Sequence, residues 1–342
     1  MYTITCDLLR QALDPHVAGF RCEPIKAGGK PSRLDRVWLS YAAPTRAPAS
    51  IVVKRIGPDW PRDPRGADRE FLFCTQLLPQ LDIAAPRLYD AKHDAATGYR
   101  LLLMEDLAPK YRFPPPTHAW TPAEARCLLR AYAMLHARGR EAVPPATERD
   151  WLWPSQEELL LGEEVPRAAH GLAQQPFWRA VPGLDALIAW TRAFGMSADR
   201  PTETLLHGDL YPPNAGLPHD LDDEAVLIDW EMAAVGPAEL ELAYMFLQPH
   251  HAERNLVRDD MLAYYWAQRE AIEGRVPSPD ERCVRQRYAD AVLALALLPV
   301  AHKVAVRPYP LGSSQAVYWD NMFGILNRRL HELADEIVGG TT

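Results

Sequence analysis

The chain has 342 residues, of which 48% are hydrophobic and 24% charged, with a formal net charge of −8 at pH 7. This length predicts two domains or one domain with two lobes, and the composition excludes a disordered, collagen-like or coiled-coil chain. The negative charge argues against a nucleic-acid partner, because phosphate contacts require a basic face.

The amino terminus and the cysteines predict a cytoplasmic protein without a membrane partner. Residues 1–7 lack the basic segment and apolar core of a signal peptide. The most apolar stretch, residues 291–300, is about half the length of a membrane span. Five widely spaced cysteines without a C-x-x-C pair indicate reduced, mostly buried thiols rather than a disulfide framework or a zinc site. The sequence is compatible with a monomer or a homodimer.

The amino-terminal part has the pattern of a sheet. Residues 36–41 alternate between apolar and polar, and residues 51–56 form a β-branched run, so both predict strands. An apolar stripe predicts a helix over residues 68–78, and residues 99–104 return to strand.

Helices dominate the rest of the chain. Thr121 to Glu124 form a capping box with proline at the first helical position, and Ser155 and Ser278 begin the same signature. Gly236-Pro237 begins another helix, and a strand-rich segment covers residues 203–231. We therefore expect a bilobal α+β fold, with a small sheet-bearing lobe at residues 1–105 and a larger, mainly helical lobe at residues 106–342.

The strand-rich segment carries oxygen-bearing side chains in a suggestive order. Two short apolar strands, 215–217 and 225–228, flank a polar turn and predict a hairpin. Asp209 and Asn214 precede the first strand and Asp229 follows the second, so the hairpin would bring all three together. Such oxygens suit Mg²⁺ bound with substrate phosphates, and phosphoryl transfer also needs a carboxylate that accepts the proton of an attacking hydroxyl.

This segment resembles the catalytic segment of the aminoglycoside phosphotransferase and choline kinase-like family, which has the protein-kinase-like fold. The resemblance implies that Asp209 is the catalytic base, that Asn214 and Asp229 hold Mg²⁺, and that His207 braces the loop. It also explains Gly208, which is the small-molecule-kinase version of this position. An aspartate alone would be read as a turn or capping residue, but the three together favour the functional interpretation.

Two amino-terminal residues fit the same resemblance. Lys54 ends an apolar strand, where its ammonium would reach the nucleotide phosphates, and Glu70 in the next helix would pair with it. Asp68 competes with Glu70 for this role. Alternatively, Lys54 is a solvated edge charge and residues 68–70 are a solvated helix face.

Two further segments are assigned to the nucleotide by resemblance. Gly28, Gly29 and Ser32 lie where the family has a glycine-bearing phosphate loop, although a Gly-Gly turn is common, and no P-loop motif is present. Met104, Glu105 and Leu107 resemble the hinge, whose backbone would hydrogen-bond adenine. A core strand ending in acidic residues fits this second segment equally well.

Three features outside the predicted site are interpreted separately. His136 lies in a segment that resembles the family's L-x-x-L-H helix, and we expect it to be structural. Glu241 departs from the family, which usually has aspartate there. His250-His251 would point about 100° apart on a helix, which favours a helix-end pair over a metal site.

These features predict a kinase of a small-molecule hydroxyl that depends on ATP and Mg²⁺, with GTP not excluded. A nucleotide-binding pseudokinase or scaffold is the alternative, but it would typically have lost one of the four residues Lys54, Asp209, Asn214 or Asp229. A protein kinase is disfavoured because no A-P-E-type segment follows Asp229. A macrolide, a sugar or a nucleoside antibiotic would also be possible acceptors.

The charge distribution favours a cationic acceptor. Residues 1–107 carry 15 Lys and Arg against 13 Asp and Glu, whereas the remainder carries 22 basic and 32 acidic residues. An acidic lobe would raise the local concentration of an acceptor that bears amino or ammonium groups. Eight of the ten tryptophans also lie beyond residue 107 and would offer cation–π contacts.

Overall fold

The computed structural model describes residues 2–25, 33–58, 66–115, 118–152, 204–209, 212–236 and 258–274, together with residues 238, 239, 241, 242 and 245. The chain divides into two compact units. The first comprises Met1–Pro116, Pro144–Trp153 and His207–Ala233, and the second Thr117–Val143, Pro154–Leu206 and Ala234–Thr342. The predicted catalytic segment around residues 207–229 thus folds with the amino-terminal strands.

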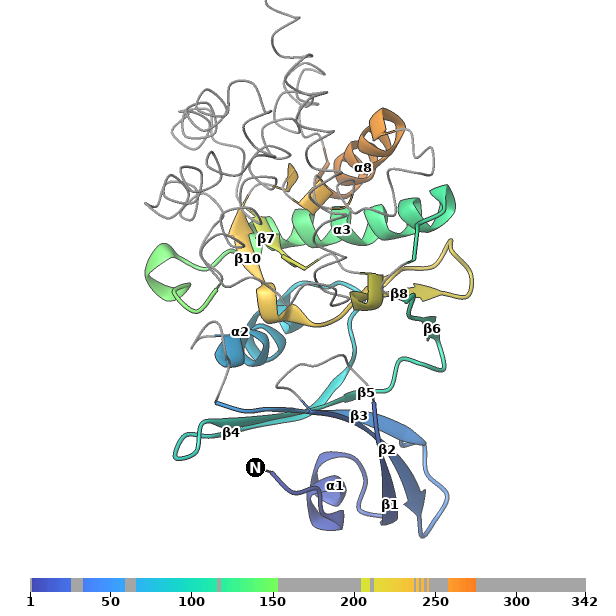
Figure 1. Ribbon diagram of the computed structural model, residues 1–342, viewed down its shortest axis with the longest axis vertical. Coiled ribbons are helices and arrows are strands. Elements are labelled where there is room, and N and C mark those ends of the chain that lie inside the picture. Colours follow the sequence, from blue (N-terminus) through green and yellow to red (C-terminus); the bar gives the residue numbers. More distant parts are fainter. Residues whose placement is uncertain are drawn as a thin grey trace, which may run out of the picture. The chain divides into compact units, whose positions relative to one another are not determined.

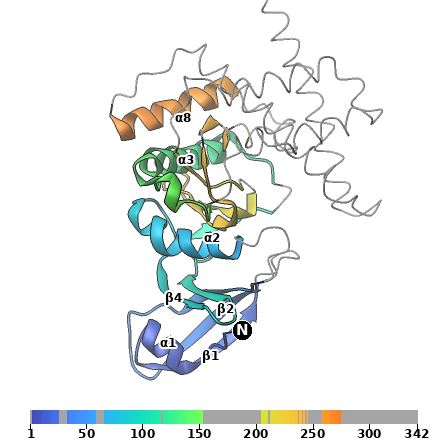
Figure 2. The same ribbon diagram turned by 90° about the vertical axis from the view of Figure 1, so that its left-hand side faces the viewer.

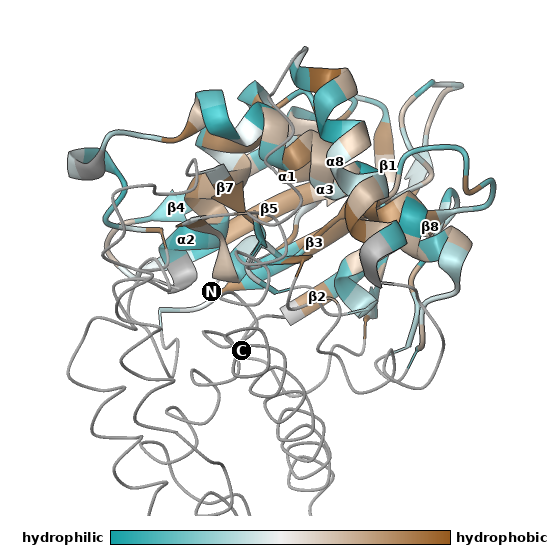
Figure 3. Ribbon diagram, turned by 90° about the horizontal axis from the view of Figure 1, so that it is seen from above, coloured by the Kyte–Doolittle hydropathy of each residue, from teal (hydrophilic) through white to brown (hydrophobic). Residues whose placement is uncertain are grey.

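A five-stranded antiparallel sheet forms the framework of the first unit (Figure 1). Its strand order is β1-β2-β3-β5-β4, so the apolar strands β3 and β5 have neighbours on both sides. Figure 3 shows the hydrophobic colouring of these two strands. The strands are β1 (Val17–Pro24), β2 (Arg33–Tyr41), β3 (Ser50–Ile56), β4 (Leu88–Asp94) and β5 (Tyr99–Glu105).

The two faces of this sheet are covered by different helices (Figures 1 and 2). α1 (Cys6–Ala12) begins at Thr5, whose hydroxyl accepts the Leu8 N–H at 3.2 Å and so caps the helix. Its buried Leu9 packs against one face of the sheet. The core on that face contains Ile4, Leu9, Val17, Val37, Ile51, Val53, Leu101 and Leu103.

The helix on the opposite face is not uniform. α2 (Gly66–Leu72) continues as a π-helical turn (Phe73–Leu77) and a 3₁₀ turn (Leu78–Gln80). The Leu78 N–H bonds to the Phe73 carbonyl, which is the wide spacing of a π-helix. The single helix predicted over residues 68–78 is therefore replaced by three consecutive helical segments of different pitch.

The predicted hairpin is confirmed. β8 (Ala215–Pro218) pairs antiparallel with β9 (Val226–Leu227), and β6 (Tyr111–Arg112) adds a third strand beside β8. Short 3₁₀ turns precede and follow the hairpin at Pro212–Asn214 and Trp230–Met232. Another 3₁₀ turn covers Ala146–Glu148.

The described part of the second unit is built around α3 (Pro122–Ala142). Its predicted capping box is present: the Thr121 hydroxyl accepts the Glu124 N–H, and the Glu124 carboxylate accepts the Thr121 N–H. Gly139 allows close packing, since a Cβ there would lie 2.9 Å from the Leu205 Cβ. α3 packs against α8 and a two-stranded sheet, whose bounds are β7 (Thr204–Leu206), β10 (Ala234–Gly236) and α8 (Arg258–Glu273).

Several expectations lie partly or wholly outside the described residues. These are the helix starts at Ser155 and Ser278, the pair His250-His251, and Cys283. Residues 239, 241, 242 and 245 are helical, in agreement with a helix that follows Gly236-Pro237. The cysteines that the structure describes are thiols; Cys74 and Cys127 are buried, whereas Cys22 is exposed. Across the described segments, no helix is long and apolar enough to cross a membrane.

Candidate active site

Lys54 lies at the centre of the site. Its Nζ is 2.5 Å from the Glu70 carboxylate and 2.7 Å from Oδ1 of Asp229. Side chains alternate along β3, so Lys54 points to the α2 face, whereas the next residue, Arg55, pairs with Asp35 on the other face. Lys54 is therefore a buried, doubly paired ammonium and not a solvated edge charge.

The competition between Glu70 and Asp68 is resolved by their contacts. Glu70 is buried and reaches Lys54, whereas Asp68 pairs with Arg100. Two residues apart on a helix, these carboxylates point in different directions. The structure thus brings Glu70, from α2, to the lysine of β3.

This ion cluster is electrostatically unbalanced. Burial disfavours the ammonium of Lys54, but Asp229 and Glu70 outweigh burial and hold its pKa above the ordinary value. Burial raises the pKa of Glu70 to about 7; Lys54 opposes this rise and Asp229 adds to it. One ammonium therefore faces two carboxylates, an arrangement that favours an additional cation near Asp229.

The His207-Gly208-Asp209 loop is held by hydrogen bonds at both ends of the imidazole ring. Nε2 of His207 donates to the Ile228 carbonyl at 2.9 Å, and Nδ1 accepts the Asp209 N–H at 3.3 Å. His207 thereby ties the segment before β8 to the segment after β9. A bracing role for His207 agrees with this geometry.

Gly208 is needed for this loop to exist. Its φ is 80°, and a Cβ there would lie 2.0 Å from the carbonyl oxygen of Met232. Any other residue would meet both the strain of a positive φ and a backbone clash. With glycine at position 208, the loop can approach the Met232 backbone, which a side chain would prevent.

Asp209 and Asn214 are in direct contact. Nδ2 of Asn214 donates to Oδ2 of Asp209 at 2.9 Å and to its backbone carbonyl at 3.1 Å. Across the hairpin, the Ile228 N–H bonds to the Asn214 carbonyl at 3.0 Å. Asn214 therefore lies opposite the residue before Asp229, as the hairpin prediction requires.

Asp229 has a left-handed backbone, with φ of 70° and ψ of 64°. This conformation is uncommon for a residue other than glycine, although aspartate adopts it more readily than most, and such residues concentrate at functional sites. The two residues that follow Asp229 are themselves held by contacts with Phe73, His207 and Arg69. These contacts were not predicted from the sequence.

Trp230 and Arg69 provide those contacts. The Trp230 ring stacks on Phe73 with centroids 4.2 Å apart and lies 4.6 Å from the His207 ring. Arg69, which is 1% exposed, donates to the Glu231 carbonyl at 2.7 Å and to the Trp151 carbonyl at 3.1 Å. An aromatic residue directly after Asp229 was a signal for the first contact, whereas Arg69 within Asp-Arg-Glu looks like a solvated residue.

The donor set fits Mg²⁺ and a nucleotide. Asn214 and Asp229 offer hard oxygen donors, and the Nδ2 contacts to Asp209 turn the Asn214 amide oxygen away from that carboxylate. Among the described residues, no group of three His, Cys, Asp or Glu forms a metal cage. Two protein ligands would suffice, since Mg²⁺ keeps waters and binds substrate phosphates.

The structure describes Met104, Glu105 and Leu107, which were expected to form a hinge, whereas Gly28, Gly29 and Ser32 lie outside the described residues. Met104 pairs with Val52 across β5 and β3, on the same side of the sheet as Lys54. The Glu105 N–H donates to the Arg87 carbonyl at 2.8 Å. The Leu107 carbonyl accepts two N–H groups, from Lys110 and Tyr111, so the backbone here is ordered.

His136 has a structural setting in the second unit. It is fully buried, with Nε2 2.8 Å from the Glu241 carboxylate and Nδ1 2.7 Å from the Tyr265 hydroxyl. Burial lowers its pKa, although Glu241 opposes this effect. Glutamate at 241, the departure from the family pattern, thus still reaches this histidine.

Comparison with known proteins places the chain among phosphotransferases. The model of the phosphotransferase enzyme family matches residues 33–308. No curated protein matches the chain significantly by sequence. The confirmed points are the α+β, protein-kinase-like fold and the resemblance inferred from His207 to Asp229.

Three solved structures illustrate the likeness in fold. An aminoglycoside phosphotransferase-like protein from Ralstonia eutropha JMP134 has a TM-score of 0.64 at 16% identity, covering 96% of this chain and 97% of that one. The GDP complex of aminoglycoside 2'-phosphotransferase-IIIa has a TM-score of 0.57 at 12% sequence identity, and the match covers 95% of this chain and 97% of that one. An ethanolamine kinase from Plasmodium vivax has a TM-score of 0.54 at 13% sequence identity, and the match covers 91% of this chain and 83% of that one. Because the family model covers most of the sequence, the chain belongs to the phosphotransferase enzyme family and is a small-molecule phosphotransferase that acts on a hydroxyl group.

Proposed function

We propose that this protein transfers the γ-phosphoryl group of ATP to a hydroxyl of a small cationic molecule, with Mg²⁺ as cofactor. The observation that carries the proposal is the contact of Lys54 with both Glu70 and Asp229. These three residues lie in separate segments of the chain. Because burying a cluster of charges costs desolvation free energy, stability alone does not explain why they are brought together.

Each residue of the site has a proposed role in the transfer. Asp209 accepts the proton of the acceptor hydroxyl, so that the alcohol oxygen can attack the γ-phosphorus in line while ADP leaves. Lys54 steadies the nucleotide phosphates and Glu70 fixes its position. His207 braces the loop that carries Asp209.

The metal would be held by Asn214 and Asp229. When bound, Mg²⁺ neutralises the charge of the phosphates. Asn214, anchored through Nδ2, and the left-handed Asp229 lie on the two arms of the hairpin at its open end. Both side chains are therefore preorganised before a nucleotide arrives.

We propose that residues 1–105 form the nucleotide-binding lobe and that residues 106–342 supply the catalytic and acceptor-binding groups. Met104, Glu105 and Leu107 would meet the base, and Gly28, Gly29 and Ser32 the phosphates. A related fold has been solved with GDP, so GTP remains an alternative donor.

The acidic remainder of the chain supports an acceptor with amino or ammonium groups. The similarity in fold to an ethanolamine kinase is consistent with an amino alcohol as acceptor. A screen for nucleoside-diphosphate formation, ADP from ATP or GDP from GTP, tests this proposal directly. It would cover aminoglycosides, ethanolamine- and choline-like amines, macrolides, nucleoside antibiotics and neutral sugars, each with ATP and with GTP.

We expect acceptor-dependent ADP formation with one or more cationic compounds. The signal should require Mg²⁺ and disappear in Asp209→Ala. Nucleotide binding without turnover of any acceptor would instead indicate a pseudokinase. Turnover of a neutral acceptor, with every cationic compound inert, would contradict the acceptor class but not the kinase.

A further inference from the structure

A buried carboxylate that the catalytic scheme does not use lies in the hinge. Asp106 follows the last residue of β5, and its side chain is 4% exposed. A buried carboxylate requires hydrogen-bonding partners. It stands between Glu105 and Leu107, the two residues proposed to meet the nucleobase.

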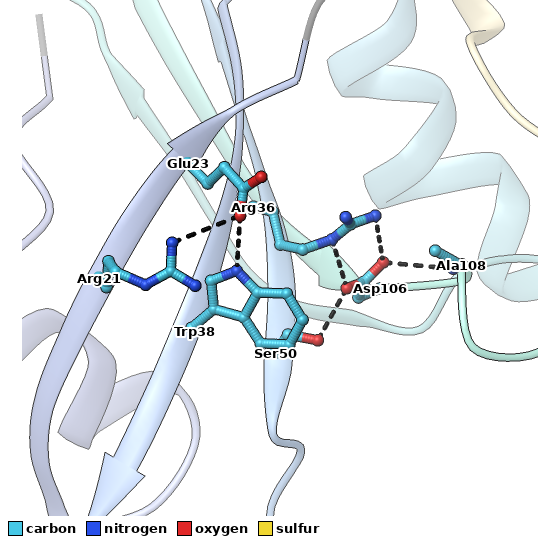
Figure 4. A network of polar contacts seen from close by, with 7 residues as sticks. All are labelled: Arg21, Glu23, Arg36, Trp38, Ser50, Asp106 and Ala108. Atoms are coloured by element: carbon cyan, nitrogen blue, oxygen red, sulfur yellow. Dashed lines mark hydrogen bonds and ion pairs between the residues drawn. The ribbon is translucent and has the colours of Figure 1, made fainter.

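Four donors converge on this carboxylate (Figure 4). Nε of Arg36 donates to Oδ2 at 2.8 Å and Nη2 to Oδ1 at 3.3 Å, a bidentate ion pair. The Ser50 hydroxyl donates at 2.7 Å and the Ala108 N–H at 3.2 Å. Asp106 therefore closes a turn in its own segment and fastens that turn to β2 and β3.

Arg36 is itself held in place from β1 and β2. Its guanidinium lies 5.8 Å from the Trp38 ring, and Arg21 lies 5.6 Å from the same ring. Glu23 accepts from the Trp38 indole N–H at 3.0 Å and from Arg21 at 3.4 Å. Figure 4 shows Arg36 extending from Trp38 toward Asp106.

The network lies on the nucleotide side of the sheet. Side chains alternate along a strand, and Ser50 and Lys54 are both even-numbered positions of β3, so they share a face. Arg36 pairs with Val52, which lies between them on that face. The hinge is thus fastened from the face on which Lys54 stands.

We propose that Asp106 is a positioning residue for the nucleobase. It keeps the backbone of residues 105–107 in the conformation that meets the base, and it does so without touching the nucleotide. Charge-assisted hydrogen bonds are among the stronger polar contacts, so their loss would let this segment adopt other conformations. A smaller binding-competent fraction weakens apparent affinity in proportion. The inference rests on the proposed nucleotide-dependent function.

The position of Asp106 makes the effect specific to one end of the nucleotide. Loss of Asp106 should weaken adenosine and Mg·ATP by the same factor, since both present the base to the hinge. Lys54→Met should weaken Mg·ATP and leave adenosine unchanged, because Lys54 is proposed to meet the phosphates. A variant that is partly unfolded would instead show a lower binding stoichiometry, with the affinity of the folded molecules unchanged.

Calorimetric titration of the full chain with Mg·ATP and with adenosine tests this. In Asp106→Asn we expect both dissociation constants to rise about tenfold at unchanged stoichiometry, the factor that corresponds to a tenth of the molecules being competent. Asp94→Asn is the matched control. Asp94 closes the turn at the other end of β5, accepting the N–H groups of Ala96 and Thr97 at 3.0 Å and 3.3 Å.

Each outcome bears on the inference. Wild-type affinities in Asp106→Asn would overturn it, as would a loss confined to Mg·ATP. If the wild-type chain binds no nucleotide, the proposed function fails first and the inference with it. Should Asp106→Asn not fold, Ser50→Ala removes one donor and leaves the carboxylate, and we expect about a threefold rise for both ligands. Unchanged affinities in Ser50→Ala would then contradict the role of Asp106.

Discussion

At the scale of single residues, the candidate site is centred on one ammonium, Lys54, that contacts the carboxylates of Glu70 and Asp229. Asp209, Asn214 and Asp229 could be predicted from their spacing around a hairpin, because a hairpin brings its ends together. Arg69 could not, since a charged residue beside Asp68 and Glu70 looks solvated until its burial is known. The choice between Glu70 and Asp68 likewise depended on the direction of α2.

Gly208→Ala tests the close approach to Met232. We expect a loss of about 3 kcal/mol in the free energy of unfolding, because a positive φ and a backbone clash add together. Gly274→Ala is the matched control: Gly274 has a φ of 71°, but nothing lies within 4 Å of its Cβ position. It should lose only about 1 kcal/mol. Equal losses in urea unfolding would show that the clash is absent.

Glu70→Gln tests the charge imbalance around Lys54. The pKa of Glu70 is raised to about 7 from an ordinary 4.5, so the folded chain binds this proton more tightly than the unfolded chain. The contribution of Glu70 to the free energy of unfolding of the wild-type chain therefore becomes less favourable as pH rises from about 4.5 to 7.

The glutamine variant lacks this titration. Relative to wild type, its free energy of unfolding should increase between pH 5 and pH 8, as measured by urea unfolding at both values. A difference that stays constant over this range would mean that Glu70 is ionised throughout.

Helices and strands were predicted correctly from the sequence where local chemistry determines them. The capping box at Thr121 and the β-branched run of β3 are of this kind. Other elements were not predicted, among them α1, β1, β4 and α8. β1 and β4 are edge strands of the sheet and lack a continuous apolar run. The π-helical turn after α2 was not predicted either; its first residue, Phe73, stacks on Trp230, a contact that no local pattern specifies.

Arg69→Met tests the link between α2 and the segment after Asp229. The substitution removes a buried hydrogen bond to the Glu231 carbonyl and a partly buried one to the Trp151 carbonyl. We expect a loss of about 2 kcal/mol in the free energy of unfolding, roughly the cost of removing these two charge-assisted hydrogen bonds. Turnover should fall more than tenfold in the fraction that remains folded. Asp68→Asn, on the same helix but paired with Arg100, should leave turnover near wild type.

At the scale of the whole molecule, charge is the property most directly readable from the sequence. The excess of acidic residues beyond residue 107 predicts that acceptor binding weakens as salt rises. The acceptor KM should increase severalfold between 50 mM and 500 mM salt, by more than the KM for ATP. An acceptor KM independent of ionic strength would remove the argument for a cationic substrate. The acceptor itself could not be predicted, because its identity depends on side chains that no motif specifies.

The most direct measurement compares wild type with Asp209→Ala, using ADP formation with an acceptor found in the screen and Mg·ATP binding by calorimetry. If Asp209 is the base, turnover should fall by at least about 10²-fold, the usual cost of removing a general base. Mg·ATP affinity should stay within about threefold, since Asp209 is proposed to act on the acceptor. Asp229→Ala should weaken Mg·ATP binding as well. Undiminished turnover in Asp209→Ala would contradict phosphoryl transfer at this site.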